Sequence, residues 1–452
     1  MKKYLIFLLA TIIAYGGSLH YGFSQDDWYF LFISKANSVK DVLLFFSPWN
    51  QQGFPFYRPL STQLYYFLAT SIAGLSGAPI AMHVFMILLL SIAGFILYLL
   101  ARQLKFSLLS STLVGLLYVG SSVHFLSLYY IAATQQLLSG TLMLFALYWV
   151  KTKNAQWPAY LAFVLALLCK ENAILLPAYL LLLSDWSIIK IRSLMCNLKS
   201  LLPYIFIALI YLTLRLTSRV EVQSEYQPVF GLRALGTFKI YLSFLFGYYE
   251  KIQDYVLPSG IRQYLIDTRP FGYLTVAGSL ISASTIGYLT INSLLRRQFV
   301  KLQLQYLLMF TIGLSPWLLL PDHIFPHYLD LPMAALALLL ISLCRSQIVA
   351  IILTISLLVA NYGGIKSSEI LHWTVLRSRL NTAAIPQLIN RGLCQSNAIV
   401  LSGDNLLAKE LSYSLSMSNG PRVLCNNSIL QVYYGETNIN EGKIINIEGV
   451  RQ

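Results

Sequence analysis

The sequence predicts an all-α polytopic membrane protein with about eleven transmembrane helices and a small C-terminal extracytoplasmic α/β domain. Three observations support this fold class. Of the 452 residues, 57% are hydrophobic and only 11% are charged, whereas a soluble domain carries about 25% charged residues. Apolar runs long enough to span a bilayer recur along the chain, and a more polar segment with strand-like runs follows them. A chain this poor in charge cannot cover a water-facing surface, but a bilayer requires no polar coat.

Short loops separate the apolar runs, and Lys and Arg gather in every second loop. Because cytoplasmic loops carry an excess of these residues, the clusters indicate the inner side of the membrane. The N-terminus is then cytoplasmic and the C-terminal domain is outside. The net charge of +14 reflects these clusters, so no nucleic-acid partner is expected. The expected spans are 4–22, 79–101, 108–123, 125–149, two within 157–186, 200–216, 271–294, 302–320, 328–343 and 347–363.

The stretch 157–186 is expected to form two short helices. A single helix of this length would measure about 45 Å, against a hydrocarbon core of about 30 Å. A single crossing would also place the cations at 190–199 outside, against the positive-inside rule. Two helices joined by a turn at Lys170 and Glu171 return these cations to the inner side.

This topology divides the chain into a transmembrane domain, residues 1–363, and a C-terminal domain, residues 364–452. Two outer loops are long, 23–78 and 217–270, and a surface helix is expected near 61–75. Whether 235–249 crosses the membrane stays open, because that piece is apolar but a crossing would upset the parity of the spans.

The C-terminal domain shows alternating strand-like and helix-like patterns. Strands are expected at 398–401, 422–425 and 443–447, and a helix near 404–417. Cys394 and Cys425 both lie in this outer segment. Disulfides persist outside the cytoplasm, so the two cysteines are expected to form one.

Asp26 and Asp27 follow the first span directly and are the first candidate site. A carboxylate is costly at the margin of the hydrocarbon and uncommon there unless it has a function. It can act as a general base on an acceptor hydroxyl, or bind a metal. The alternative is a helix end with solvated charges.

Arg58 lies further along the same loop, in the segment Tyr57-Arg58-Pro59-Leu60. Its planar guanidinium suits phosphate oxygens, and aromatic residues flank it. The alternative is an interfacial arginine that contacts lipid headgroups.

Lys170 and Glu171 interrupt a strongly apolar stretch. Neighbours on a helix point about 100° apart, so these two side chains do not simply neutralise each other. Each therefore needs another partner near the outer edge of the bilayer. Charges inside membranes are usually functional, and a lysine at this depth can hold the phosphate of a carrier lipid. The alternative is a structural ion pair with another span.

The remaining candidates are single residues near span ends, His83, His327 and Tyr328. Asp322, His323 and His327 are chemically able to bind a divalent metal, but two histidines in a short turn are more often polar turn residues. No metal site and no cofactor is therefore predicted. The sequence contains no Walker loop, dinucleotide fingerprint, nucleophile elbow or zinc-binding helix motif.

Together these motifs resemble the GT-C superfamily of membrane glycosyltransferases, in particular the protein O-mannosyltransferases and the aminoarabinose transferases. Asp26-Asp27 is similar to the acidic motif after the first span of that family. Tyr57-Arg58-Pro59-Leu60 is similar to its YRPL segment, and Leu168-Cys-Lys-Glu-Asn172 with Pro177 to its LSKE…P segment. The similarity in order and spacing covers residues 1–345.

The sequence departs from the family pattern at two places. His327 stands where relatives often have arginine, and Thr134-Gln135-Gln136 stands where they often have a basic residue. No tetratricopeptide repeats follow, so protein mannosylation is not supported.

The resemblance implies transfer of a sugar from a polyprenyl-phosphate carrier to a glycan, lipid or protein acceptor on the outer face, with inversion. It implies that Asp27 or Asp26 activates the acceptor. It also implies that Arg58 and Lys170 hold the donor phosphate. His327 is a further candidate for binding that phosphate, and Glu171, Tyr57, Tyr328 and His83 are candidate supporting residues. The alternative is a non-catalytic carrier, flippase or assembly protein that handles lipid-linked sugars. The composition fits a bacterial inner membrane, and the sequence identifies neither the sugar nor the acceptor.

Overall fold

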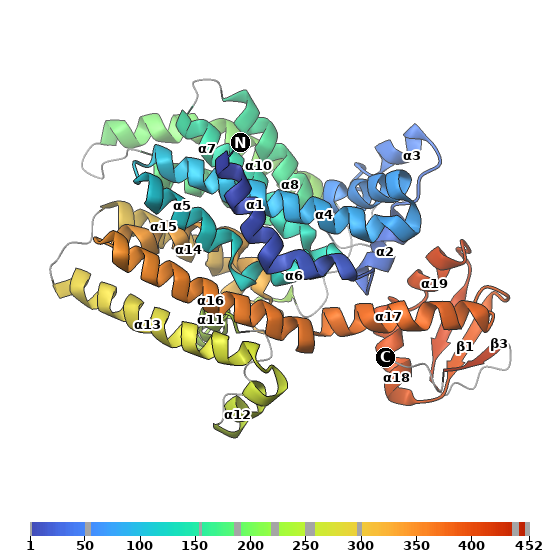
Figure 1. The fold of residues 1–452 in the computed structure, drawn as a ribbon. Coiled ribbons are helices and arrows are strands. Elements are labelled where there is room, and N and C mark those ends of the chain that lie inside the picture. Colours follow the sequence, from blue (N-terminus) through green and yellow to red (C-terminus); the bar gives the residue numbers. More distant parts are fainter. Residues whose placement is uncertain are drawn as a thin grey trace.

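The chain folds into a bundle of apolar helices, from one end of which a small C-terminal unit projects (Figure 1). The computed structural model describes residues 2–49, 56–152, 156–184, 191–217, 226–248, 258–295, 301–435 and 443–447. The segment Gln51–Pro55 and several of the inner cations, such as Arg296 and Arg297, lie outside these residues.

The helices follow one another with few long interruptions. They are α1 (Lys2–Tyr15), α2 (Asp26–Ile33), α3 (Val39–Leu44), α4 (Tyr65–Gln103), α5 (Leu108–Val119), α6 (Phe125–Tyr129), α7 (Thr134–Thr152), α8 (Trp157–Cys169), α9 (Leu176–Leu183), α10 (Ile191–Thr217), α11 (Arg233–Leu245), α12 (Pro258–Asp267), α13 (Phe271–Leu295), α14 (Lys301–Leu318), α15 (Asp330–Leu343), α16 (Gln347–Leu371), α17 (Trp373–Asn390), α18 (Asn405–Ser414) and α19 (Asn419–Leu424). Short turns of other helix types join them at η1 (Gly16–His20), η2 (Leu60–Leu64), η3 (Ser122–His124), η4 (Ile131–Ala133), η5 (Glu171–Leu175) and η8 (Pro326–Leu329).

Eight helical segments in the described part of the chain are long and apolar enough to cross a membrane. Each overlaps one of the expected spans. They are Lys2–His20, Leu60–Gln103, Leu108–Tyr129, Ile131–Thr152, Lys199–Thr217, Phe271–Ser293, Pro326–Leu343 and Gln347–Leu371. The expected span 302–320 corresponds to α14, whose first turns carry Lys301, Gln303 and Gln305 and are less apolar. A polytopic helical architecture is thus confirmed, while the number of eleven spans stays a prediction.

The described part of the stretch 157–186, which ends at residue 184, forms two helices, as expected. Helix α8 ends at Cys169 because Lys170 adopts an extended backbone, with φ −162° and ψ 139°. Pro177 lies in the first turn of α9, where its missing N–H costs nothing. Tyr160 near the beginning of α8 and Ser184 after the end of α9 line one cavity. The two helices therefore return to the same side, and Lys170 lies at the tip of a hairpin.

Helix α4 continues from η2 and contains a break. Gly74 has φ 67° and ψ 171°, a conformation that glycine adopts without steric penalty. The part of α4 before Gly74 is therefore a separate helical piece in front of the span, where a surface helix was expected near 61–75.

Helix α11 occupies most of the apolar piece 235–249. Its 13 residues measure about 20 Å, less than the hydrocarbon core. It buries Tyr241 and Phe244 and packs against the turns η3 and η8. Residue 249 itself lies outside the described residues.

The C-terminal unit is built on a three-stranded parallel sheet. Strand β1 (Ala398–Ser402) lies between β2 (Gln431–Tyr434) and β3 (Lys443–Asn446). Because parallel neighbours need a crossover connection, α18 and α19 lie between β1 and β2. The central strand buries Ile399, Val400 and Leu401, which explains its uninterrupted apolar sequence. Helix α16 continues past the expected domain boundary at 363 to Leu371, and α17 extends from its end (Figure 1).

Two of the three expected strands are confirmed, as β1 and β3, and the expected helix is α18. The strand expected at 422–425 is wrong, because these residues lie in and just after α19. Pro421 lies in the first turn of α19, a position that favours a helix start. The remaining strand is β2, which was not predicted. Short apolar runs do not distinguish a strand from a buried helix.

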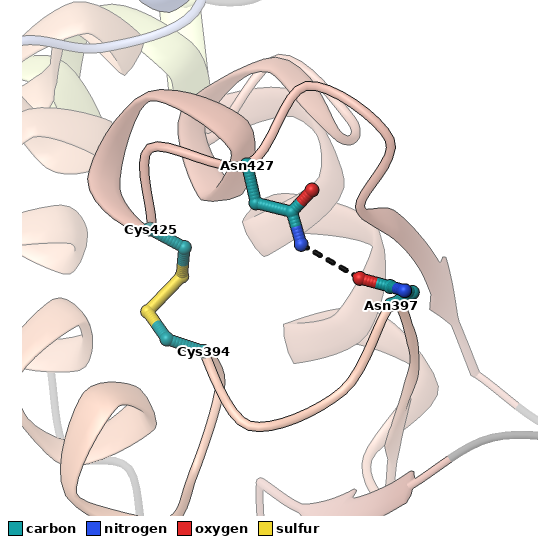
Figure 2. The surroundings of a disulfide bond; sticks show 4 residues. All are labelled: Cys394, Asn397, Cys425 and Asn427. Atoms are coloured by element: carbon teal, nitrogen blue, oxygen red, sulfur yellow. Dashed lines mark hydrogen bonds between the residues drawn. A yellow bond between two sulfur atoms is a disulfide. The ribbon is translucent and has the colours of Figure 1, made fainter.

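The expected disulfide is present. Figure 2 shows Cys394, after the end of α17, joined to Cys425 at the end of α19. Nearby, the side chain of Asn427 donates a hydrogen bond of 2.8 Å to Asn397. These links hold α19 to the segment that leads into β1.

Candidate active site

The two aspartates at the start of α2 occupy different environments. Asp27 is 1% exposed, and its carboxylate accepts hydrogen bonds from the Ser24 N–H at 2.8 Å and the Tyr66 hydroxyl at 2.7 Å. Burial raises the pKa of Asp27 to about 7, although the hydrogen bonds from Ser24 and Tyr66 act in the opposite direction. Asp26 is exposed and lines a polar cavity. Only Asp26 is therefore placed to meet a ligand.

Arg58 is held by two other side chains just before η2. Its Nε and Nη2 donate to the two carboxylate oxygens of Glu171, with Nε–Oε2 at 2.7 Å. Its Nη1 donates to Gln135 at 2.7 Å, and its guanidinium stacks over Phe56 at 4.1 Å. Since an arginine has five N–H donors, at least two remain for a ligand, but Glu171 already balances the charge.

Lys170 has no such balance. The side chain is 4% exposed, and it forms no hydrogen bond or ion pair with any residue that the structure describes. Its Nζ lies 4.7 Å from the ring centre of Tyr328 and 5.6 Å from that of Trp317. Those two rings stack in parallel, with centroids 3.8 Å apart. The ammonium group of Lys170 thus lies next to two stacked aromatic rings, where cation–π attraction stabilises its charge.

The turn between α14 and α15 brings His323 and His327 to the same place. Nδ1 of His327 is buried and has no hydrogen-bond partner among the described residues. Burial, together with the nearby Lys170 and Arg58 side chains, lowers the pKa of His323 to about 4. His323 is therefore neutral at pH 7, and the cations give the site a positive character.

One cavity gathers most of the predicted residues. Asp26, Arg58, Lys170, His327 and Tyr328 line a space of about 500 Å³. Asp26 begins α2, Arg58 lies just before η2, Lys170 lies at the tip of the α8–α9 hairpin, and His327 and Tyr328 lie in η8. Each of these positions is a helix end that the charge pattern assigns to the outer side.

Three predicted supporting residues lie behind this cavity wall or away from it. Glu171 pairs with Arg58 but does not line the cavity. Tyr57 is buried and donates to the Phe46 carbonyl at 2.7 Å. His83 is buried between the carbonyls of Leu128 and Tyr21. Tyr57 and His83 thus act in packing.

Helix α17 supplies cavity residues that the sequence did not indicate. Trp373 and Arg377 line the cavity from the first helix of the C-terminal unit, together with Gln135, Tyr130 and Tyr226 from other elements. The spacing of Trp373 and Arg377, four residues apart on a helix, places them on one face. That spacing is a usable signal, but nothing in the sequence shows which face meets the transmembrane bundle.

A second buried polar cluster was also missed. Asp330 Oδ1 lies 2.7 Å from His124 Nδ1 and accepts a hydrogen bond from the Tyr118 hydroxyl at 3.0 Å. Both side chains are fully buried, and neither lines the polar cavity. An aspartate at the start of an apolar span was the available signal. In the described part of the chain, no group of three or more His, Cys, Asp or Glu side chains is arranged to hold a metal ion.

The fold and cavity define a mostly helical, polytopic membrane protein with a polar, positively charged cavity at one end of its bundle. No protein-family model and no curated protein matches the chain. Among solved structures, the crystal structure of the Archaeoglobus fulgidus oligosaccharyltransferase in the apo form is similar, with 13% sequence identity and a TM-score of 0.38. The similarity covers 97% of this chain and 56% of that one, so this chain spans little more than half of that protein. At this level of similarity the function has to be inferred from the cavity itself.

Proposed function

We propose that this chain is an integral membrane glycosyltransferase. It moves a sugar from a polyprenyl-phosphate carrier to an acceptor on the outer face of the membrane, with inversion at the anomeric carbon. The observation that carries the proposal is a buried lysine, Lys170, which forms no ion pair with the described residues and shares a cavity with the exposed carboxylate of Asp26.

Lys170 binds the donor phosphate in this proposal. A buried charge is costly unless it is paired, and the described neighbours of Lys170 are mainly aromatic rings. A phosphate would supply the missing anion. Arg58 contributes its remaining N–H donors, since Glu171 already engages its Nε and part of its fork. His327 lies on the same wall with a free ring nitrogen among the described residues.

Asp26 is the base that receives the acceptor proton. The acceptor oxygen attacks the anomeric carbon, the bond from that carbon to the phosphate oxygen breaks, and the phosphate leaves with the electron pair. The acceptor proton passes to the Asp26 carboxylate, on the face opposite the phosphate. The protein walls around this carboxylate limit its hydration and raise its pKa, which the Tyr130 hydroxyl partly offsets. A raised pKa makes a carboxylate a better base near neutral pH.

Binding of the donor head is tested with farnesyl phosphate, a soluble polyprenyl-phosphate analogue, on the purified full-length protein in detergent. Lys170→Met is expected to weaken binding about tenfold or more, because a charge-assisted contact is lost. Lys409→Met, at an exposed position on α18, serves as the control and should bind like the wild type. Equal binding by Lys170→Met and the wild type would remove the phosphate assignment.

Catalysis is tested with a polyprenyl-phosphate sugar. Asp26→Asn should bind farnesyl phosphate like the wild type. It should release polyprenyl phosphate from the donor at least about a hundredfold more slowly, because base catalysis is lost. If the wild type binds the donor but forms no glycosidic bond with any candidate acceptor, the non-catalytic carrier is favoured instead.

A further inference from the structure

The C-terminal unit contributes a wall to the polar cavity through helix α17. Trp373, its first residue, and Arg377, one turn later, both line the cavity. The inference drawn from this wall rests on the proposed transferase function, because it concerns the second substrate of the same site.

The Arg377 side chain is held in place by its neighbours but retains N–H donors for a ligand. Its Nε donates to Glu410 of α18 at 3.0 Å, and its guanidinium lies 5.3 Å from the Trp373 ring and 4.8 Å from the Tyr413 ring. Within the described residues its two terminal nitrogens have no acceptor. An arginine fixed through Nε presents those two nitrogens end-on, a geometry that suits the two oxygens of an oxyanion.

This wall lies on the Asp26 side of the cavity. The Trp373 ring packs edge-on against Tyr130, with centroids 5.5 Å apart. The Tyr130 hydroxyl in turn accepts the Asp26 N–H at 3.1 Å. Lys170, by contrast, rests on Tyr328 and Trp317. An inverting displacement needs the base and the departing phosphate on opposite faces of the sugar. The acceptor therefore enters beside Asp26, over α17.

We propose that Trp373 and Arg377 form the acceptor subsite, and that this subsite takes a saccharide with an anionic substituent, a carboxylate or a phosphate. The indole offers a flat apolar face with a polar edge, against which a sugar ring can stack. The guanidinium pairs with the anionic group. Arg377 is thus a specificity-determining residue supplied by the C-terminal unit.

The test compares three soluble probes on the full-length protein in detergent. These are a uronic-acid tetrasaccharide, its neutral counterpart with reduced carboxyl groups, and that neutral tetrasaccharide carrying one phosphate. The wild type should bind at least one charged probe roughly tenfold more tightly than the neutral one, the scale of one charge-assisted contact. Arg377→Gln should lose this preference and leave farnesyl phosphate binding unchanged.

Two further variants separate recognition from damage to the fold. Glu410→Gln removes the partner of Arg377 but keeps the cation, so the preference for charged probes should persist or grow. Arg379→Gln changes an exposed arginine on the same helix, outside the cavity lining, and should behave like the wild type.

Equal binding of charged and neutral probes by the wild type would overturn the subsite proposal. So would an Arg377→Gln variant that weakens farnesyl phosphate binding as much as Lys170→Met, because Arg377 would then belong to the donor end. A wild type that fails to bind farnesyl phosphate at all contradicts the proposed function itself, and is thus distinct from failure of the acceptor subsite alone.

Discussion

At the residue scale, pairs of neighbours in the sequence take unlike partners. Lys170 and Glu171 are adjacent, yet Glu171 holds Arg58 while Lys170 is left with aromatic rings. Asp26 and Asp27 are adjacent, yet one is exposed and the other is buried. Asp26 and Asp27 both lie in the first turn of α2, where consecutive side chains diverge by about 100°. Lys170 has an extended backbone between α8 and η5, which separates the direction of its side chain from that of Glu171. The sequence shows where such pairs lie, but it does not show which residue of a pair lines the cavity.

Asp27 yields a pH-dependent prediction. Its pKa is about 7 in the folded protein, against about 3.9 in an unfolded chain. The folded state therefore holds this proton more tightly, and the associated stability is fully present below pH 4 and is lost as the pH rises through 7. Asp27→Asn should gain thermal stability relative to the wild type as the pH rises from 5 to 8. Thermal unfolding in detergent measures this difference.

Asp41 serves as a control because its pKa shift has the opposite direction. Hydrogen bonds from the backbone of Asn37 and the side chain and backbone of Ser38 lower the pKa of Asp41. The associated stability is present above pH 4 and lost only in more acidic solution. The melting difference between Asp41→Asn and the wild type should thus stay constant from pH 5 to 8. The same constant difference for Asp27→Asn would show that Asp27 is already ionised throughout this range.

At the element scale, the C-terminal helices hold the chain immediately before the acidic pair. The Asn381 side chain on α17 donates to the carbonyls of Phe23 at 3.0 Å and Ser414 at 2.8 Å. The Ser414 carbonyl also accepts the N–H of Gln25 at 2.8 Å. Gln25 has φ 49°, which is unusual for a residue with a side chain. Contacts with α17 and α18 therefore stabilise the turn that presents Asp26.

Removal of the Asn381 amide should uncouple turnover from donor binding. Asn381→Leu leaves two buried carbonyls without this donor, at a cost of about 1–3 kcal/mol for an unsatisfied group. We expect a lower melting temperature and a kcat for donor cleavage reduced about tenfold or more, because Asp26 loses its position. Farnesyl phosphate binding should not change, because Lys170 lies on other elements.

A neighbouring threonine distinguishes positioning from general destabilisation. The Thr382 hydroxyl donates only within α17, to the Ser378 carbonyl at 2.9 Å. Thr382→Val should therefore leave kcat unchanged. If Asn381→Leu folds with wild-type kcat, the turn before Asp26 does not depend on α17.

At the scale of the whole molecule, the C-terminal unit contributes residues to the polar cavity. The expected boundary at 363 suggested a separate outer domain, but α16 passes through that point and α17 reaches the cavity. Helix α19 packs against α2, where Trp28 lies close to Gly420. The transmembrane bundle and the helices of the C-terminal unit therefore both contact the segment that carries the acidic pair.

The proposed orientation predicts the reactivity of the disulfide. In a variant with Cys169, Cys196 and Cys344 replaced by alanine, a membrane-impermeant maleimide applied to the outer face should label Cys394 and Cys425 only after reduction. The disulfide protects both thiols, and reduction exposes them on the outer side. Labelling without reduction would argue against the disulfide. Labelling after reduction only from the inner face would reverse the topology.

The sequence by itself determined the polytopic helical architecture and the hairpin at Lys170. These features follow from local properties, the length of apolar runs and the position of cations, which are readable one segment at a time. Only the tertiary structure decided that Asp26 rather than Asp27 opens to the cavity, that Glu171 occupies Arg58, and that Trp373 and Arg377 complete the wall. Those outcomes depend on which helix faces meet, and facing is set by packing between segments hundreds of residues apart in the chain.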